Sequence, residues 1–447
     1  MKTIQEMLQE LSQCIVTVSG EFRFRTNWNG GKAHQPDLDV FDPNVPFCIE
    51  NVGETLASIQ YNTKNINIKI SKDYKTWNDY TSGTEIELNP KERVYIKSDY
   101  VEDTGYKPRF VFNGDRAHLR ARGNIASLIY GTNDAYVNKY TSTEKYCYYY
   151  MFSGCTSLVQ APELPATTLA NYCYSYMFNG CTSLVQAPEL PATQLANYCY
   201  SLMFYGCTSL TQAPELPATT LAVSCYSYMF YGCTSLTQAP ELPATTLADG
   251  CYSSMFYNCT SLTQAPKLPA TQLANHCYQS MFYGCKSLTQ APELPATKLA
   301  DYCYSNMFYV CTSLTQAPKK LPATTLAERC YSSMFDTCTS LTQAPELPAT
   351  TLAERCYYAM FYDCKSLTKA PELPATTLVD SCYTYMLSGC TKINYVKCLA
   401  TNIFATNCTY YWLSNVSSTG DFYTPAATKW ESGSDGIPAG WTRHDIT

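Results

Sequence analysis

The chain has 447 residues, too many for one compact hydrophobic core, and its composition of 46% hydrophobic and 15% charged residues excludes a disordered protein. The formal net charge of −6 gives no electrostatic support for binding nucleic acid. A membrane span needs roughly 18 consecutive apolar residues, and the sequence contains no such run, so we predict no span.

Residues 1–14 predict a short amphipathic helix. Its apolar face is formed by four residues at i, i+3, i+4 and i+7, namely Ile4, Met7, Leu8 and Leu11. A helix of this length is marginal alone, so it packs on the next domain or docks on another protein or a symmetry mate, and we favour docking. Glu6 and Glu10 interrupt the stretch where a secretory signal would be apolar. We therefore expect the protein to stay in the cytoplasm of the cell that makes it or to leave by a route other than a cleaved signal.

Residues 15–122 predict an antiparallel β domain, similar to a sandwich, that anchors the chain. Ile66, Ile68 and Ile70 alternate with polar residues, which is the period of a half-buried strand. Turn signals such as Ser82-Gly83 and Asn89-Pro90 separate such stretches. Residues 123–146 then form a joint and the N-terminal cap of the next region.

Residues 147–381 repeat a unit of 26 residues, of which CYSYMFYGCTSLTQAPELPATTLADG, from Cys225 to Gly250, is typical. Self-similarity at this fixed period predicts a solenoid. One inserted residue at Lys319-Lys320 shifts the phase once. The first cysteine of the unit recurs at Cys147, Cys173, Cys199, Cys225, Cys251, Cys277, Cys303, Cys330, Cys356, Cys382 and Cys408.

Each unit predicts a short helix followed by a short parallel strand. Cys225, Met229 and Cys233 share one helical face. Pro240 and Pro243 exclude a helix from the second half of the unit and favour an extended segment. The fold class is therefore mixed, an antiparallel β domain followed by a solenoid with a short parallel strand and a short helix in each unit. Helices pack farther apart than strands, so the stack should curve, with its helices on the convex side.

Residues 382–447 predict degenerate units and a C-terminal cap. The unit beginning at Cys382 departs from the consensus, and the next has Val416 in place of its second cysteine. Trp412, Trp430 and Trp441 are three of only five tryptophans in the chain. We expect these three to cover the open end of the core.

The cysteines predict a reduced, apolar core and no metal site. Twenty of the 24 form ten pairs separated by seven residues, whereas zinc sites use closer spacing. On a helix, the two sulfurs of a pair would lie ~12 Å apart, too far for a disulfide. We expect neither a metal nor a cofactor.

No enzyme motif occurs in the sequence. The four histidines are scattered, and only His276 adjoins a cysteine, Cys277, at a position where other units carry tyrosine or serine. A nucleophile–base pair needs a unique site, which near-identical units do not offer. We therefore predict no catalysis.

Exposed polar residues form columns along the repeat. In a purely structural interpretation, the columns are an amide ladder beside a solvated acidic edge. In a functional interpretation, they form a repetitive face that binds a polymer or a cation. A further column, including Tyr174, Tyr200 and Tyr226, suits packing, with outer ring edges available to a glycan. The candidate binding residues are Gln186, Glu189, Gln212, Glu215, Gln238, Glu241, Gln290 and Glu293.

The solenoid resembles the BspA-like leucine-rich repeats of bacterial surface proteins. The resemblance rests on MFSGCTSL at Met151–Leu158, MFYGCTSL at Met203–Leu210 and MFYGCKSL at Met281–Leu288, each followed by LPAT. Here Met replaces the usual Ala of the family motif, and the unit is longer. The resemblance implies adhesion or the recognition of a protein or a glycan. Surface members usually carry an export signal, which makes a virion component an alternative location.

These features favour a recognition or adhesion module, such as a phage virion fibre or decoration protein. The solenoid would contact a protein or a surface glycan, and the N-terminal region would contact another protein or a symmetry mate. The main alternative is a passive structural spacer. A cell-surface adhesin exported without a cleaved signal is a more distant alternative, as is an enzyme.

Overall fold

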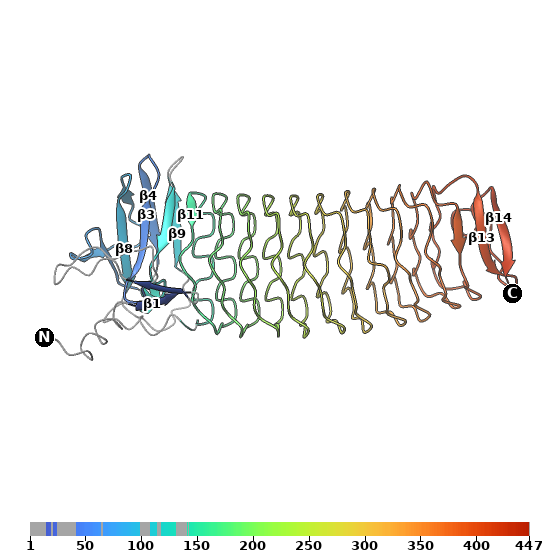
Figure 1. Cartoon of the computed structure of the whole chain (residues 1–447), viewed down its shortest axis with the longest axis horizontal. Coiled ribbons are helices and arrows are strands. Elements are labelled where there is room, and N and C mark those ends of the chain that lie inside the picture. Colours follow the sequence, from blue (N-terminus) through green and yellow to red (C-terminus); the bar gives the residue numbers. More distant parts are fainter. Residues whose placement is uncertain are drawn as a thin grey trace.

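The computed structural model describes residues 15–18, 21–24, 42–63, 66–98, 108–113, 118–130, 141 and 143–446. A β-rich region lies at one end of a long row of stacked coils, and the C-terminus lies at the other end (Figure 1). We call each repeat unit a coil, and equivalent positions in successive coils a column. The predicted helix at residues 1–14, with Ile4, Met7, Leu8 and Leu11, lies outside the described residues.

The N-terminal region is mainly antiparallel β-structure, as predicted. A hairpin pairs β1 (Ile15–Val18) with β2 (Glu21–Phe24). A three-stranded sheet has the order β7 (Ile86–Leu88), β4 (Ala57–Asn62) and β9 (Arg109–Asn113). A six-stranded sheet has the order β11 (Leu158–Gln160), β10 (Leu119–Arg122), β3 (Phe47–Asn51), β8 (Arg93–Ser98), β5 (Ile68–Ser71) and β6 (Asn78–Tyr80).

Aromatic side chains join the two larger sheets. Phe110 of β9 lies 5.4 Å from Phe47 of β3 and 4.4 Å from Tyr61 of β4, measured between ring centroids. The only helix in the described ranges is α2 (Ser127–Tyr130). The Ser127 hydroxyl accepts a hydrogen bond from the Phe47 amide at 2.8 Å and donates to the Ile96 carbonyl at 3.1 Å. This buried serine therefore ties α2 to β3 and β8, two inner strands of the six-stranded sheet.

The β region and the solenoid share one hydrophobic core. Strand β11 belongs to the first coil, and it pairs in parallel with β10 of the β region. Phe152 of the first coil stacks on Phe110 with 5.1 Å between ring centroids. The β region therefore covers the N-terminal end of the stack, and that end of the core is not left open to water.

The first half of each coil is a series of turns, and the predicted helix is wrong. Ser224, Tyr228 and Gly232 have positive φ angles of 49°, 56° and 70°. Between these residues, successive backbone amides donate alternately to a carbonyl of the same coil and to a carbonyl of the next coil. The Met229 amide donates to the Tyr226 carbonyl three residues back at 3.2 Å, and the Phe230 amide donates to Met255 of the next coil at 2.9 Å.

The turns satisfy the backbone by a different route from a helix. A helix would bond every amide to a carbonyl four residues back, within the same segment. Here about half of these bonds go to the neighbouring coil, which exists only because the unit repeats. The positions of Cys225, Met229 and Cys233, four residues apart, match this four-residue turn period as well as a helical face.

The extended half of each coil pairs through single residues. Parallel bridges join Gln186 to Gln212 and Gln212 to Gln238, and other columns pair similarly, as between Thr220 and Thr246. Prolines at two positions of this half have no amide hydrogen, so a longer ladder does not form. The predicted parallel pairing is therefore present, mostly as isolated bridges and not as strands.

The predicted curvature is also wrong, because the coils form a nearly straight row (Figure 1). Backbone hydrogen bonds join adjacent coils on the turn side, as from Tyr226 to Cys251 at 3.0 Å. Backbone bridges join the same coils on the extended side. Both sides therefore repeat at about the 4.8 Å spacing of paired strands, and neither side is wider than the other.

The core of the stack consists of columns of identical side chains. Successive phenylalanines stack, as Phe204 does on Phe230 with 5.6 Å between ring centroids. The Cys233 thiol donates to the Phe204 carbonyl of the preceding coil with a sulfur–oxygen distance of 3.1 Å. All 23 cysteines in the described part are free thiols. Burial raises the pKa of Cys207 to about 12, so that thiol stays protonated and unreactive at neutral pH.

Tryptophans pack at the C-terminal end of the stack. A parallel sheet of β12 (Tyr395–Lys397), β13 (Gly420–Pro425) and β14 (Trp441–Ile446) follows the last turns. Trp412 is fully buried, with ring centroids 5.9 Å from Tyr383 of the last full coil and 5.4 Å from Trp430. Its indole nitrogen donates to the Gly436 carbonyl at 3.0 Å. Trp412 thus ends the buried tyrosine column.

Candidate functional site

The predicted Gln and Glu columns lie exposed on the extended side of the coils, and we call this surface the Gln–Glu face. The extended segment turns its leucines and one alanine into the core and its polar side chains outward. The amide of Gln290 donates to that of Gln316 at 2.9 Å, which is one step of an amide ladder. All eight candidates are exposed in these two columns: Gln186, Glu189, Gln212, Glu215, Gln238, Glu241, Gln290 and Glu293.

Two recesses lie between neighbouring coils on the Gln–Glu face. The first, of about 640 Å³, is lined in part by Gln264, Lys267, Gln290 and Glu293. The second, of about 710 Å³, has the equivalent positions of later coils in its lining. Both recesses are walled by prolines, whose rings stand beside the outward polar side chains. The repeat therefore builds the same concave shape at two places along the stack.

Charge on the Gln–Glu face changes along the stack. Glu163, Glu189, Glu215 and Glu241 succeed one another in one column without an intervening lysine. Farther on, lysines occupy or adjoin the column, and Lys397 pairs with Glu372 at 3.2 Å. The first part of the face is therefore acidic, whereas the second part carries alternating charges.

The tyrosine column with Tyr174, Tyr200 and Tyr226 is not available to a glycan. Each of these rings is only 1% exposed and stacks on its neighbours inside the core. The expectation of accessible outer edges is therefore wrong for this column. The partly exposed tyrosines stand on other columns, such as Tyr228, which is 38% exposed.

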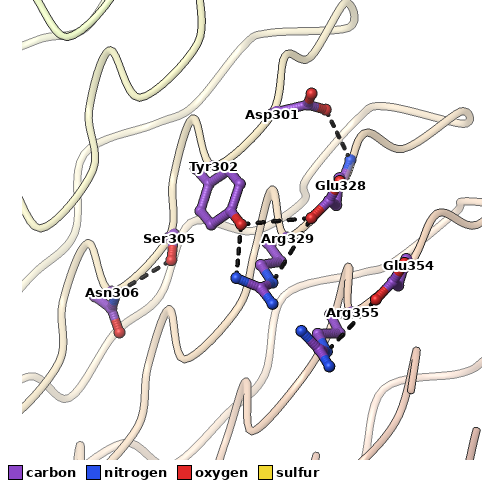
Figure 2. Close-up of polar contacts among 8 residues, drawn as sticks. All are labelled: Asp301, Tyr302, Ser305, Asn306, Glu328, Arg329, Glu354 and Arg355. Atoms are coloured by element: carbon purple, nitrogen blue, oxygen red, sulfur yellow. Dashed lines mark hydrogen bonds and ion pairs between the residues drawn. The ribbon is translucent and has the colours of Figure 1, made fainter. Parts of the chain in front are cut away.

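A second surface, on the turn side, carries a groove of about 520 Å³ over the coils that begin at Cys277 through Cys408. Figure 2 shows part of it, with Tyr302, Arg329 and Arg355 following one another on successive coils. Ser305 and Asn306 lie beside Tyr302 in the same view. The whole lining is polar or aromatic, and its only charged members are the two arginines.

The two arginines are held by neighbours on the outer edge of the groove. A nitrogen of Arg329 donates to the Tyr302 hydroxyl at 2.6 Å, and its guanidinium lies 5.2 Å from the centre of that ring. Arg329 Nε lies 3.8 Å from a carboxylate oxygen of Glu328, and Arg355 Nε lies 3.7 Å from that of Glu354. The side chains of Arg329 and Arg355 are 30% and 40% exposed, so both remain accessible.

This groove was not predicted from the sequence. The signal is a departure from the repeat, since Arg329 and Arg355 occupy a column that holds tyrosine in earlier coils, as at Tyr172 and Tyr198. An average over near-identical units hides such departures. The two arginines differ from the residues at the equivalent position of the other units, and that difference is visible in the sequence. The recess beside them is not.

His276 lies next to the same groove. Its Nδ1 is 2.9 Å from the Gln279 side-chain oxygen, and its ring stacks on Tyr302 at 4.8 Å. Within the described ranges, no group of three or more His, Cys, Asp or Glu side chains is placed to hold a metal ion. In the same ranges, no helix has the length and apolar character that crossing a membrane requires.

The fold and its exposed columns define a leucine-rich-repeat solenoid, a class of elongated proteins that present extended surfaces. The family described as "BspA type Leucine rich repeat region" matches this chain over residues 137–263, 223–358 and 305–419. These matches span more than half of the chain. The chain therefore belongs to the BspA-type leucine-rich repeat family, whose repeats are typically binding modules.

Comparison with solved structures gives a distant likeness. A leucine-rich repeat protein from Bacteroides ovatus, solved at 1.19 Å resolution, is 18% identical to this chain. The match covers 68% of this chain and 78% of that protein, with a TM-score of 0.40. No curated protein matches the chain.

Proposed function

We propose that this protein is a non-enzymatic recognition or adhesion module whose Gln–Glu face binds a repetitive ligand. The observation that carries the proposal is the recurrence of one recess, lined by glutamine, lysine, glutamate and proline, at two places three coils apart along the stack. A ligand with its own repeat could occupy several such places, and its apparent affinity would rise without any new type of contact. A protein or a surface glycan would supply such a ligand.

We also propose where the protein is located and what its N-terminal region contacts. A virion fibre or decoration protein would hold the solenoid outward while the N-terminal region docks on a partner or a symmetry mate. The placement of the β region supports a terminal anchor, because it closes one end of the stack (Figure 1). Ile4, Met7, Leu8 and Leu11 are the proposed docking residues. Deleting residues 1–14 should then abolish assembly and leave the binding of the solenoid unchanged.

Binding of the full-length protein to a glycan array, a panel of matrix proteins and whole bacterial cells tests the proposal. We expect wild-type binding to at least one target and a weaker apparent affinity in a Gln264→Ala, Gln290→Ala, Glu293→Ala variant, which removes three polar side chains of the first recess and leaves the second recess intact. The matched control replaces three exposed threonines of another column, Thr182, Thr208 and Thr234, with alanine and should bind normally.

A passive spacer is the alternative function. The continuous core and the nearly straight stack favour it, because such a rod sets a fixed distance between its ends (Figure 1). Wild-type protein that binds no target on the array, the panel or the cells would support the spacer and contradict recognition.

A further inference from the structure

The groove on the turn side exists because one column loses its bulky side chains. The column that contains Tyr228 is mostly aromatic in the first coils and aromatic again at Tyr385 and Tyr411. Between these tyrosines the side chains are small, which leaves space above the turns. The five small residues are Ser254, Ser280, Asn306, Ser333 and Ala359.

The charge inside the groove is positive, although the surrounding surface is not. Arg329 and Arg355 line the groove, whereas none of the nearby carboxylates does. Figure 2 shows Glu328 and Glu354 on the side of the two arginines that faces away from Ser305 and Asn306. The carboxylates contact the two arginines through Nε, and both arginines still line the groove. Among the residues that the structure describes, Arg355 forms an ion pair with Glu354 through Nε, and its guanidinium has further N–H donors for a ligand.

The remaining lining indicates a hydrophilic ligand with flat faces. Ser332 and Ser381 offer hydroxyl groups, Asn306 and Asn407 offer amides, and Tyr358 and Tyr410 offer aromatic rings. No aliphatic side chain lines the groove, whereas sites for apolar small molecules are mostly apolar. Tyrosine combines an apolar ring with a polar edge, which suits a sugar ring and its hydroxyls. Arginine is the side chain that best matches a carboxylate, through two parallel hydrogen bonds.

We propose that this groove binds a carboxylate-bearing oligosaccharide, with one acidic sugar at Arg329 and Arg355. Adjacent coils are about 5 Å apart, so guanidinium groups on two successive coils can approach the same carboxylate. Neighbouring sugar units then lie along the groove, over Asn306 on one side and over Tyr358 and Tyr410 on the other. An acidic peptide suits the groove less well, because the lining offers no apolar pocket for its side chains.

The site is independent of the proposed function of the Gln–Glu face, which lies on the other side of each coil. Isothermal titration calorimetry on the full-length protein at physiological salt tests it with oligogalacturonate, hyaluronan oligosaccharides and sialyllactose. Each acid is compared with its methyl ester, which keeps the sugar and removes the charge. We expect at least one acid to bind and its ester to bind about tenfold more weakly or worse.

The double variant Arg329→Ser, Arg355→Ser should lower the affinity for that acid by about tenfold or more. Serine occupies the same column at Ser224 and Ser381, so the turns accept it, and an unchanged melting temperature verifies folding. The control Lys286→Ser, Lys298→Ser removes two exposed charges outside the groove and should change the affinity by less than about twofold. The Gln264→Ala, Gln290→Ala, Glu293→Ala variant should also bind the acid normally.

Four results would overturn the proposal. One is the absence of binding for all three acids, and another is equal binding of an acid and its ester. The third is an equal loss of affinity in the arginine variant and the lysine control, which would indicate non-specific charge attraction. Competition by a short polyglutamate peptide at equal affinity would overturn the saccharide assignment in favour of an acidic peptide.

Discussion

At the scale of single residues, near-identity of the coils makes each exception informative. Asp336 occupies a column where other coils carry tyrosine, as at Tyr283 and Tyr309, or asparagine, as at Asn179. It is only 6% exposed, and the Thr337 hydroxyl donates to it at 2.8 Å. Burial, with a smaller effect from the charge of Asp363, raises the pKa of Asp336 to about 6. A carboxylate buried in this way costs stability at neutral pH.

Replacing this carboxylate by an amide should stabilise the protein at neutral pH. Between about pH 4 and pH 6 the folded state binds more protons at Asp336 than the unfolded state, so its contribution to stability falls as pH rises and stays low above pH 6. We expect Asp336→Asn to raise the free energy of unfolding by roughly 1–3 kcal/mol at pH 7.5 and by almost nothing near pH 4.

Urea unfolding at the two pH values measures this difference. The control Asp249→Asn makes the same chemical change at an exposed position whose column already holds Asn197 and Asn275. It should show no such dependence on pH. An Asp336→Asn variant that is less stable than the wild type at pH 7.5 would show that the carboxylate is stabilising and the inferred cost is wrong.

At the scale of elements, the repeat builds turns where its spacing suggests a helix. Every fourth residue of the segment has positive φ, at a glycine in several coils, as at Gly206 and Gly232, but more often at other residue types. A left-handed conformation costs a residue other than glycine roughly 1–2 kcal/mol. Here hydrogen bonds to both neighbouring coils and the burial of the core columns offset that cost.

Far-UV circular dichroism of the full-length protein tests this assignment. Because α2 has only four residues and is the one helix in the described part, we expect no double minimum of the kind that α-helices produce. A solenoid with a helix in every coil would show that double minimum strongly. Observing it would restore the helical prediction for residues 147–381.

At the scale of the whole molecule, stability depends on continuity of the stack and on closure of its ends. Each coil contacts only its neighbours, so stability is a sum of terms for coils and for their interfaces. One end is closed by β10 and Phe110, and the other by Trp412 and the sheet around β13. Loss of an interior coil should therefore cost less than loss of an end.

Excising residues 225–250 should leave a soluble, slightly shorter protein, because the coil that begins at Cys251 then stacks directly on the coil that begins at Cys199. Truncating residues 382–447 should cause aggregation, since it exposes the ring of Tyr357 and the core beneath it. Size-exclusion chromatography with light scattering distinguishes the two. Aggregation of the excised protein beside a soluble truncated protein would contradict the capping role of the C-terminal residues.

Much of the architecture can be predicted from the sequence, because the repeat is visible in the order of the residues. The 26-residue period sets the length of a coil, and the apolar columns place Met229, Phe230 and Leu236 in the core. The prolines exclude a helix from the extended half, and the alternating isoleucines indicate the antiparallel β region. The exposed Gln and Glu columns follow from the same logic. These features depend on local conformation and on which side chains avoid water.

The tertiary structure alone decided the turns, the straight stack and the groove. An apolar residue at every fourth position fits either a helix or a series of turns. The turns form because the carbonyls of the adjacent coil accept hydrogen bonds from every second amide. The same bonds equalise the spacing on the two sides and remove the expected curvature. The groove arises where small side chains on successive coils lie beside Arg329 and Arg355, residues 26 positions apart in sequence but neighbours in space. Its shape therefore depends on contacts between coils, which no single unit contains.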